Sequence, residues 1–496
     1  MKIRFIFLEI LLTFLRNTLI YNVILIASWR VIMRLSKNEI KNALFQMEKE
    51  NYNKSDFLTD KVSVLEYESE TFDGIQNGKT VKVWTKAFQK AISEHEVIYI
   101  PKSGEPYYID DTIIVSSNRK IIADDGAVIC QMEGVDVLLM RNEYVEDGTH
   151  FPIKGDNTDE NITIIGGRWE ESHRAFGGSG ITGKYDKEGS YFGIYACFHF
   201  NNLKNLTIKN VNIAHSAGFG IQICSVKNVV VDNVEFTSCY ADGLHVNGYT
   251  SYLLARNIRG EVGDDLFALN MYDWQMSSVS YGPIDMVYAE NLHSYDSSRY
   301  KALRILPGIY YYDDGSSVDC SLTNIVINGV KGINTYKFYY QTPPYLIADK
   351  NPESGGTGSG DNIYFENIDI DLHKPVDWLE PYYNSDPVRG DFAAFELGSN
   401  LGVLSLENIN LKIYKDKYPY SYLVSIGPKS VQMGEKEIFD PYVSSKLQKL
   451  YLSNIKVNGE VVIDFTDYVK EIKFDDLYGD GFSSGCGEIE EIILKN

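Results

Sequence analysis

The sequence is short of cysteine and of positive charge, and each shortage argues against a class of protein. The six cysteines among 496 residues are scattered without a CxxC pair, so the sequence indicates neither a disulfide framework nor a zinc site. Fourteen prolines and 40 glycines are ordinary numbers that argue against long disordered segments. Because 68 acidic side chains outnumber 47 basic ones, the formal net charge is −21, which makes nucleic acid or an anionic membrane a poor partner.

An uninterrupted apolar stretch is also missing from residues 1–32, although these residues are mostly apolar. Glu9, Arg16 and Arg30 divide them, and the longest charge-free run has 13 residues, too few to span a bilayer. They are either a degenerate membrane-interacting leader or an extension upstream of a true start at Met33, and a signal anchor is the alternative. We expect a cytoplasmic protein if Met33 is the start, and otherwise one that is secreted or anchored in a membrane.

Short β-branched runs dominate the chain from about residue 97, with little helix between them. Each run alternates apolar and polar residues and ends in Asn, Gly or Asp, which is typical of strands followed by turns. Strands at recurring intervals indicate either a sandwich or a solenoid. The runs are VIYI (97–100), DTIIV (111–115), KIIADDGAVICQ (120–131), NITIIGG (161–167), NLTIKNVNI (205–213), NVVVDNVEF (228–236), SLTNIVINGV (321–330), NIYFENIDI (362–370), GVLSLENINL (402–411) and LYLSNIKVNG (450–459).

A repeat of 23 residues favours the solenoid over the sandwich. The run that begins at Asn205 recurs in register at Asn228, and the amides of Asn210 and Asn233 fall at the same point of each copy. Sandwich strands share no such period, whereas coils of a parallel β-helix must, because each coil stacks on the one before it. We therefore predict an all-β protein, a right-handed, single-stranded parallel β-helix (a solenoid), with stacked asparagines at a corner.

The segment before the strands predicts a helical cap. Residues 36–50 begin with a capping box and carry apolar side chains at helical spacing, which indicates a short peripheral helix. Residues 81–96 place Trp84 and Phe88 on one face of a second helix, which suits it to cover the open end of a solenoid. We divide the chain into residues 1–32, an N-terminal helical segment 33–70 and a β-helix domain 71–496.

Long insertions widen the spacing of the later repeats to about 40 residues. Loops of this length on a minimal scaffold usually build a binding site. Several carry clustered tyrosines, whose flat rings suit stacking on sugars, although the same rings could simply pack against the side of the solenoid. The insertions are 172–191, 271–300, 331–360 and 373–392, and the tyrosine clusters are YYY (310–312), FYY (338–340) and PYY (381–383).

Three carboxylates gather in two neighbouring repeats. Asp242 and Asp265 are equivalent in successive copies, Asp264 precedes the latter, and the preceding copy has Phe219 at this point. Neighbouring strands lie about 4.8 Å apart, so these carboxylates share a small volume if they lie at a corner. Like-charge repulsion then raises at least one pKa, and a protonated acid beside an ionised base is what glycoside hydrolysis requires. Single Asp-Gly pairs are also everyday turn residues, and clustered Asp oxygens suit calcium.

The same residues resemble the motifs of a known enzyme family. The stretches YADGLHVNG (240–248) and GDDLFALN (263–270) are similar to the "NTDG" and "DD" motifs of polygalacturonase-type glycoside hydrolases, family 28, in the pectate-lyase-like superfamily. FDGIQNGKT (72–80) and NITIIGGRW (161–169) resemble other parts of such proteins, and the likeness covers about residues 70–310. The resemblance implies that Asp264 is the general acid and that Asp242 and Asp265 activate water. Hydrolysis would then be inverting and would use no cofactor and no metal.

The family's histidine and substrate-gripping motifs, "GHG" and "RIK", are not found. The next coil, NLHSYDSSRYKALRILPG (291–308), offers substitutes for them. His245, three residues after Asp242, is either a substrate contact or a hydrogen-bonded wall residue. The candidate substrate-binding residues are His245, Asn270, His293, Arg299, Lys301 and Arg304.

Three functions follow from these patterns. The first is a glycoside hydrolase that acts on a poly- or oligosaccharide. The second is a polysaccharide lyase, which needs a base and a cation beside a uronate carboxylate, and Lys301 and Arg304 could supply that cation. The third is a non-catalytic carbohydrate-binding protein of the tailspike type, in which Tyr310–Tyr312 would matter more than Asp264. In all three the expected partner is a carbohydrate, with no nucleic acid, and no membrane at the β-helix domain.

Overall fold

The computed structural model describes residues 34–55, 60–135, 137–144, 158–171, 196–273, 279–311, 315–339, 358–373, 392–427, 430–433, 436–439, 445–472 and 487–495. The predictions for residues 1–32, for the insertion 172–191, for most of 373–392 and for the tyrosines at 381–383 lie outside these residues. Among the helices of the described part, none is long and apolar enough to cross a membrane.

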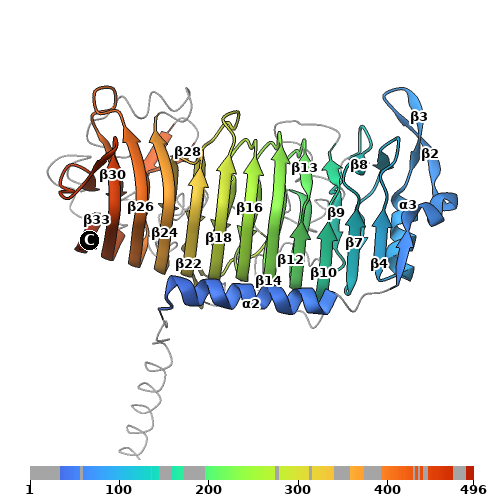
Figure 1. Cartoon of the computed structure of the whole chain (residues 1–496), viewed down its shortest axis with the longest axis horizontal. Helices are drawn as coiled ribbons and strands as arrows, with labels where there is room; N and C mark the ends of the chain where they lie inside the picture. Colours follow the sequence, from blue (N-terminus) through green and yellow to red (C-terminus); the bar gives the residue numbers. More distant parts are fainter. Residues whose placement is uncertain are drawn as a thin grey trace, which may run out of the picture. The chain divides into compact units, whose positions relative to one another are not determined.

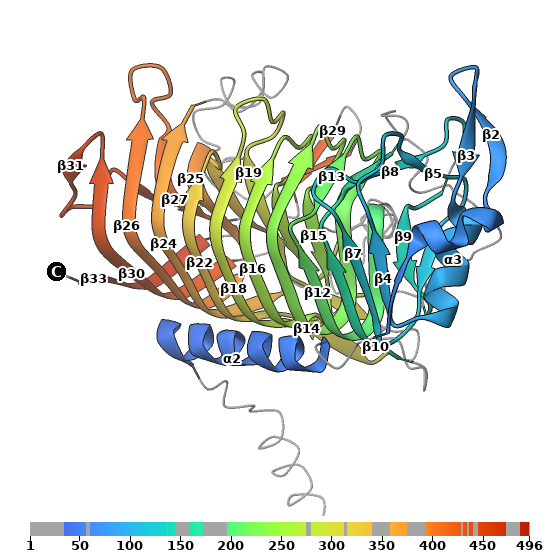
Figure 2. The same cartoon turned by 45° about the vertical axis from the view of Figure 1, so that its right-hand side comes forward.

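Successive coils pair strand upon strand in parallel, which confirms the predicted β-helix (Figures 1 and 2). The strands form three rows. The long-strand row contains β1 (Lys61–Ser63), β4 (Val97–Ile100), β7 (Arg119–Ala123), β10 (Asp159–Ile165), β12 (Ala196–Lys209), β14 (Phe219–Thr237), β16 (Ser251–Gly260), β18 (Ile284–Ser294), β22 (Leu322–Lys331), β24 (Ser359–Leu372), β26 (Asn400–Ile413), β30 (Ser445–Val457) and β33 (Gly487–Lys495).

The short-strand row lies on a second side of the coils. It joins β6 (Ile113–Val115), β9 (Met140–Asn142), the first halves of β12 and β14, β15 (Leu244–Asn247), β17 (Phe267–Asn270), β19 (Ala302–Leu306), β23 (Thr335–Tyr339), β25 (Phe392–Gly398), β27 (Ser421–Ile426) and β32 (Val469–Glu471). The third row joins β5 (Tyr107–Ile109), β8 (Val128–Gln131), β11 (Arg168–Glu170), β13 (Asn212–Ala214) and the final residues of the later long strands.

The 23-residue register is visible in the pairing. Leu206 pairs with Val229, and Leu244 pairs with Phe267, each 23 residues on. Alternate side chains of each strand point inward, where valine, isoleucine, leucine and phenylalanine of successive coils form one fully buried core. The outward side chains of the short-strand row are left to build a site.

Asparagine ladders turn the corners. Asn118, Asn161, Asn205 and Asn228 all have left-handed backbone, with φ between 58° and 64°, and each amide donates to the one before it at 2.7–2.9 Å. Asparagine tolerates this conformation because its short polar side chain bonds locally. The predicted pair of Asn233 and Asn210 stacks in the same way at 2.8 Å.

The predicted cap is confirmed. Helix α3 (Thr85–Glu94) buries Phe88, Ala91 and Ile92 against the first coils, at the end of the β-helix that carries β4 (Figure 2). Before it lie a 3₁₀ helix (Val64–Glu70) and an antiparallel hairpin of β2 (Phe72–Gln76) and β3 (Lys79–Val83). Two more hairpins project from the coils, β20 (Gly308–Tyr311) with β21 (Ser317–Cys320) and β28 (Ser430–Met433) with β29 (Lys436–Phe439), while β31 (Glu460–Val461) folds back on β30.

Helix α2 (Lys37–Ser55) is longer than the predicted stretch and lies across the long-strand row (Figure 1). Its apolar residues Ile40 and Leu44 are fully buried. Its charged residues tie coils together that are far apart in sequence: Glu48 pairs with Lys209 and Arg256 at 2.8 Å, and Lys37 pairs with Glu366 and Glu407. The sequence showed the apolar stripe of this helix but not the surface on which the stripe packs.

The described cysteines are all free thiols. Cys224 and Cys239 are fully buried, which confirms their prediction as core residues, while Cys486 lies outside the described residues. Burial raises the pKa of the Cys130 thiol to about 12, so this partly exposed cysteine is protonated and unreactive at neutral pH.

Candidate functional site

The acidic cluster lies in the turns that lead from the third row into the short-strand row. Asp242 precedes β15 and Asp265 precedes β17, and the Asp265 N–H donates to the Asp242 Oδ1 at 3.2 Å. Gly263 shapes the second turn, since a Cβ there would lie 1.8 Å from the Tyr240 carbonyl oxygen. Only glycine permits this close approach, and the turn allows Asp264 to lie beside its two partners.

The three carboxylates meet in one small volume. One oxygen from each of Asp242, Asp264 and Asp265 lies within 4.8 Å of the others. Asp242 and Asp265 are buried, whereas 37% of the Asp264 side chain is exposed. The cluster therefore presents one carboxyl to solvent and keeps two behind it.

Arg304 is the counterion of the cluster. From β19 on the next coil, its Nη2 lies 3.0 Å from the Asp264 Oδ1 and its Nε lies 3.0 Å from the Asp265 Oδ2. Burial raises the pKa of Asp242 well above its usual range, and the charge of Asp264 adds to this effect. Burial likewise raises the pKa of Asp265, which the Arg304 guanidinium opposes. The cluster thus holds a proton at pH values where ordinary aspartates are ionised.

His245 lies in the wall of the site. Its ring stacks on Phe219 with a centroid distance of 3.8 Å, and its Nδ1 lies 2.7 Å from the Asp242 Oδ2. On the other side, its Nε2 lies 3.5 Å from a carboxylate oxygen of Asp273, to which Asn270 donates at 2.9 Å. His245 is thus almost fully buried between Asp242 and Asp273.

The remaining predicted residues lie away from the carboxylates. His293 and Arg299 are exposed, and His293 contacts the ring of Tyr295. Lys301 pairs with Asp296 at 3.2 Å. Of the nine predicted site residues, the structure therefore brings six together: Asp242, Asp264, Asp265, His245, Asn270 and Arg304.

Sequence reasoning missed the continuation of the site along the short-strand row. Lys337 pairs in register with Arg304 on the next coil, and Glu396 follows one coil later. The Lys337 Nζ lies 3.0 Å from the Tyr300 hydroxyl and 4.0 Å from a Glu396 carboxylate oxygen. The only sign of this alignment in the sequence was that Arg304 in LRI (303–305) and Lys337 in YKF (336–338), each flanked by apolar or aromatic residues, lie 33 residues apart.

The tyrosines of the YYY stretch behave partly as packing residues. The ring of Tyr310 stacks on Tyr281 at a centroid distance of 4.9 Å, and both rings lie near that of Tyr272. Tyr272 and Tyr281 are buried. Packing against neighbouring rings, the alternative to sugar stacking, therefore accounts for Tyr310.

The calcium alternative fits the donor set poorly. Calcium takes about six to eight oxygen ligands, whereas this cluster offers three carboxylates, two of which are already paired with the Arg304 guanidinium. Of the two cations named for a lyase, Arg304 is paired with the acidic cluster and Lys301 is paired with Asp296.

No family model matches the chain. The chain is similar to solved structures that share the parallel β-helix. One is an exopolygalacturonase from Thermotoga maritima (12% identity, 91% of this chain and 96% of that chain covered, TM-score 0.45). Others are the surface adhesin PfbA of Streptococcus pneumoniae (14%, 88% and 100%, TM-score 0.41) and a glycosyl hydrolase described as putative from Parabacteroides merdae (15%, 48% and 97%, TM-score 0.32). The parallel β-helix fold is defined by the strand pairing of the chain itself.

Proposed function

We propose that the chain is a glycoside hydrolase that cleaves a poly- or oligosaccharide by acid–base catalysis at the cluster of Asp242, Asp264 and Asp265. The observation that carries this proposal is the asymmetry of the cluster. Asp264 is the one carboxyl of the three that solvent reaches, while the buried pair behind it has raised pKa values. The raised pKa values keep a proton within the coupled cluster, and Asp264 is where that proton can meet a leaving-group oxygen. A protonated and an ionised carboxyl in one site are the two groups that glycosidic cleavage needs.

Asp264 acts as the general acid, because a leaving-group oxygen can approach it from solvent. Asp265 is the base, because it lies fully buried beside Asp264 and the Arg304 Nε, 3.0 Å from its Oδ2, favours its ionised form. Asp242 is different, since it accepts from the Asp265 N–H and contacts His245, and it therefore holds the base in position.

The function is tested by Asp264→Asn, assayed against a panel of glycans for released reducing ends. We expect a loss of at least about 100-fold in kcat, the range typical of a removed general acid, with an unchanged far-ultraviolet circular dichroism spectrum. Asp416→Asn, a change at an exposed aspartate outside the cluster, is the control. Full activity of Asp264→Asn would refute the proposed acid.

The stereochemistry of the product is a separate test. The resemblance implies inversion, which NMR of the first-formed anomer detects. The cluster oxygens lie within 4.8 Å, nearer the about 5–5.5 Å of retaining enzymes than the about 6.5–9.5 Å of inverting ones. Retention would make Asp265 a nucleophile instead of a base and would leave the role of Asp264 unchanged.

A further inference from the structure

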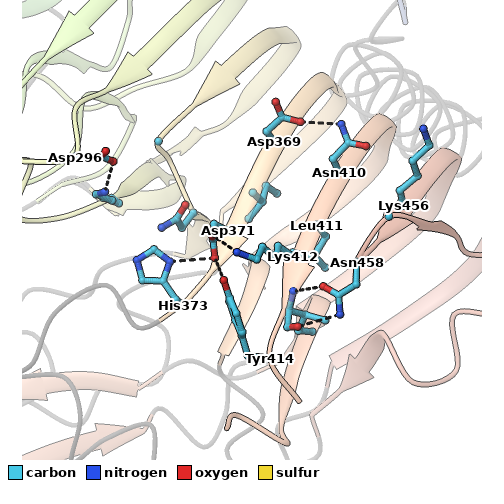
Figure 3. Close-up of a pocket in the computed structure, with 16 residues that line it drawn as sticks. Asp296, Asp369, Asp371, His373, Asn410, Leu411, Lys412, Tyr414, Lys456 and Asn458 are labelled. Carbon is cyan, nitrogen blue, oxygen red and sulfur yellow. Dashed lines mark hydrogen bonds and ion pairs between the residues drawn. The ribbon is translucent and has the colours of Figure 1, made fainter. Parts of the chain in front are cut away.

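A polar groove lies on the outer side of the third row (Figure 3), and the three carboxylates of the acidic cluster are not among its lining residues. Its volume is about 950 Å³. Its floor comes from the last residues of β24, β26 and β30, and its wall comes from turn residues such as Lys301 and Asn334. The sequence predicted the three strands of the floor and named Lys301 as a candidate binding residue, but it did not show that the outward side chains of these strands form a groove.

The floor is a register-matched array of outward side chains. Asp369 pairs with Asn410, which pairs with Lys456 on the coil after, while Asp371 pairs with Lys412 in the adjacent column. Inward residues such as Ile370 alternate with them and are buried in the core. Because these strands hold the polar residues at fixed strand spacing, the array repeats about every 4.8 Å along the axis of the β-helix.

The charges of the groove largely cancel one another. Asp371 accepts from the Lys412 ammonium at 3.3 Å and from the Tyr414 hydroxyl at 2.9 Å, and it lies 3.2 Å from the His373 Nδ1 (Figure 3). Asp369 accepts from the Asn410 amide at 2.7 Å. These groups stay accessible, since 43% of the Asp371 side chain and 59% of the Lys412 side chain are exposed. Donors and acceptors therefore alternate on a surface with little net charge.

We propose that this groove binds a neutral saccharide chain, lying along the axis of the β-helix. Hydroxyl groups both donate and accept, so they match an alternating row of carboxylates, amides and ammonium groups. A polyanion would meet the carboxylates of Asp369, Asp371 and Asp296 together with the lysines, and would therefore gain little from the charges of the groove. The groove begins on the coil that follows the acidic cluster, because the Arg299 N–H in the turn before Lys301 donates to the Val262 carbonyl at 3.0 Å. The saccharide class rests on the proposed function, but binding does not require cleavage.

The test is binding of soluble β-glucan, galactan, xylan and polygalacturonate by affinity electrophoresis and calorimetry, with Asp264→Asn as the parent chain so that no ligand is consumed. In the parent, the double variant Asp371→Ala/Lys412→Ala removes the central pair of the floor without changing the net charge. We expect it to weaken binding of a neutral glycan at least about tenfold, the equivalent of one charge-assisted hydrogen bond. The matched control is Lys449→Ala/Glu491→Ala, an exposed pair at the same 3.3 Å distance outside the groove, which should bind as the parent does.

Three results would overturn the proposal. They are equal binding by the groove variant and the parent, binding of polygalacturonate alone, and no binding of any neutral glycan by the parent. Thermal unfolding of both double variants checks that they fold. Groove-dependent binding by a chain whose wild type cleaves nothing would refute the proposed hydrolase while leaving the groove in place, so the two failures are distinguishable.

Discussion

At the scale of single residues, one guanidinium governs the chemistry of the cluster. Arg304 contacts both Asp264 and Asp265, and its charge lowers the pKa of Asp242 and of Asp265 against the effect of burial. It thereby favours the ionised form of carboxyls whose burial favours the protonated form. The residue is a positioning and electrostatic group, and its loss should be visible in the pH dependence of the reaction.

The predicted effect of Arg304→Gln is a shift of the acidic limb of the kcat/KM profile to higher pH. Without the cation the pKa of Asp265 rises further, so a higher pH is needed to ionise the base, by about one unit or more. The profile is measured on whichever glycan the panel identifies. Arg304→Lys keeps the charge and should shift the limb less. A limb at the same pH in both variants would show that Arg304 has no influence on the base.

The buried carboxyl of Asp265 should also make stability depend on pH. Its pKa in the folded chain is raised above the unfolded value of about 3.9, so folding is favoured most below that value. This advantage is lost as the pH rises toward the folded pKa, at about 1.4 kcal/mol for each unit of the shift. The Asp265→Asn variant carries a neutral amide at this position, so its free energy of unfolding does not fall in this way as the pH rises.

We therefore expect the stability of Asp265→Asn relative to wild type to increase between pH 4 and pH 8. Urea unfolding at the two pH values measures it, with Asp416→Asn as the exposed control that should follow wild type at both. A difference that stays constant or falls with pH would contradict the raised pKa. If the variant is more stable than wild type but inactive, the wild-type aspartate lowers stability in exchange for activity.

At the scale of elements, asparagine ladders hold the corners of the β-helix in register. Asn408 is central in one of them: it donates to Asn367 at 3.0 Å, accepts from Asn454 at 2.8 Å and has a φ of 55°. The side chain thus supplies two amide hydrogen bonds and tolerates a left-handed backbone that most residues avoid.

Asn408→Ala should lower the free energy of unfolding by about 1–3 kcal/mol, since it adds backbone strain and removes both amide bonds. Asn408→Gly also removes the amide bonds, but glycine adopts the left-handed backbone without strain. The free energy of unfolding should therefore fall less than in Asn408→Ala. Urea denaturation of the two variants separates the terms. If alanine and glycine cost the same, the left-handed backbone carries no strain at this corner.

The same elements show what sequence can and cannot predict here. The strands, the stacked pair of Asn210 and Asn233 and the neighbouring Asp242 and Asp265 were predictable, because a strict 23-residue period reveals which residues stack. Arg304 was predicted only as one cation among several, since insertions displace its coil from that period. The surface beneath α2 and the groove around Asp371 depend on pairing between coils about 40 residues or more apart, which no local pattern records.

At the scale of the whole molecule, the net charge of −21 should act on the choice of substrate. A chain of this charge repels polyanionic glycans at long range, and the cations nearest the cluster, Arg304 and Lys337, are both close to carboxylates. Raising the ionic strength from 10 to 150 mM shortens the Debye length from about 30 Å to about 8 Å and removes much of this repulsion.

We predict that kcat/KM for an anionic glycan such as polygalacturonate rises severalfold over that range, whereas kcat/KM for a neutral glycan stays level. Initial rates at low substrate concentration measure both, with a neutral osmolyte at matched osmolality as the control for effects other than screening. A rate on the anionic glycan that falls with salt would mean that local cations outweigh the acidic surface. In that case attraction near Arg304 and Lys337, not repulsion by the whole chain, would govern the approach of substrate.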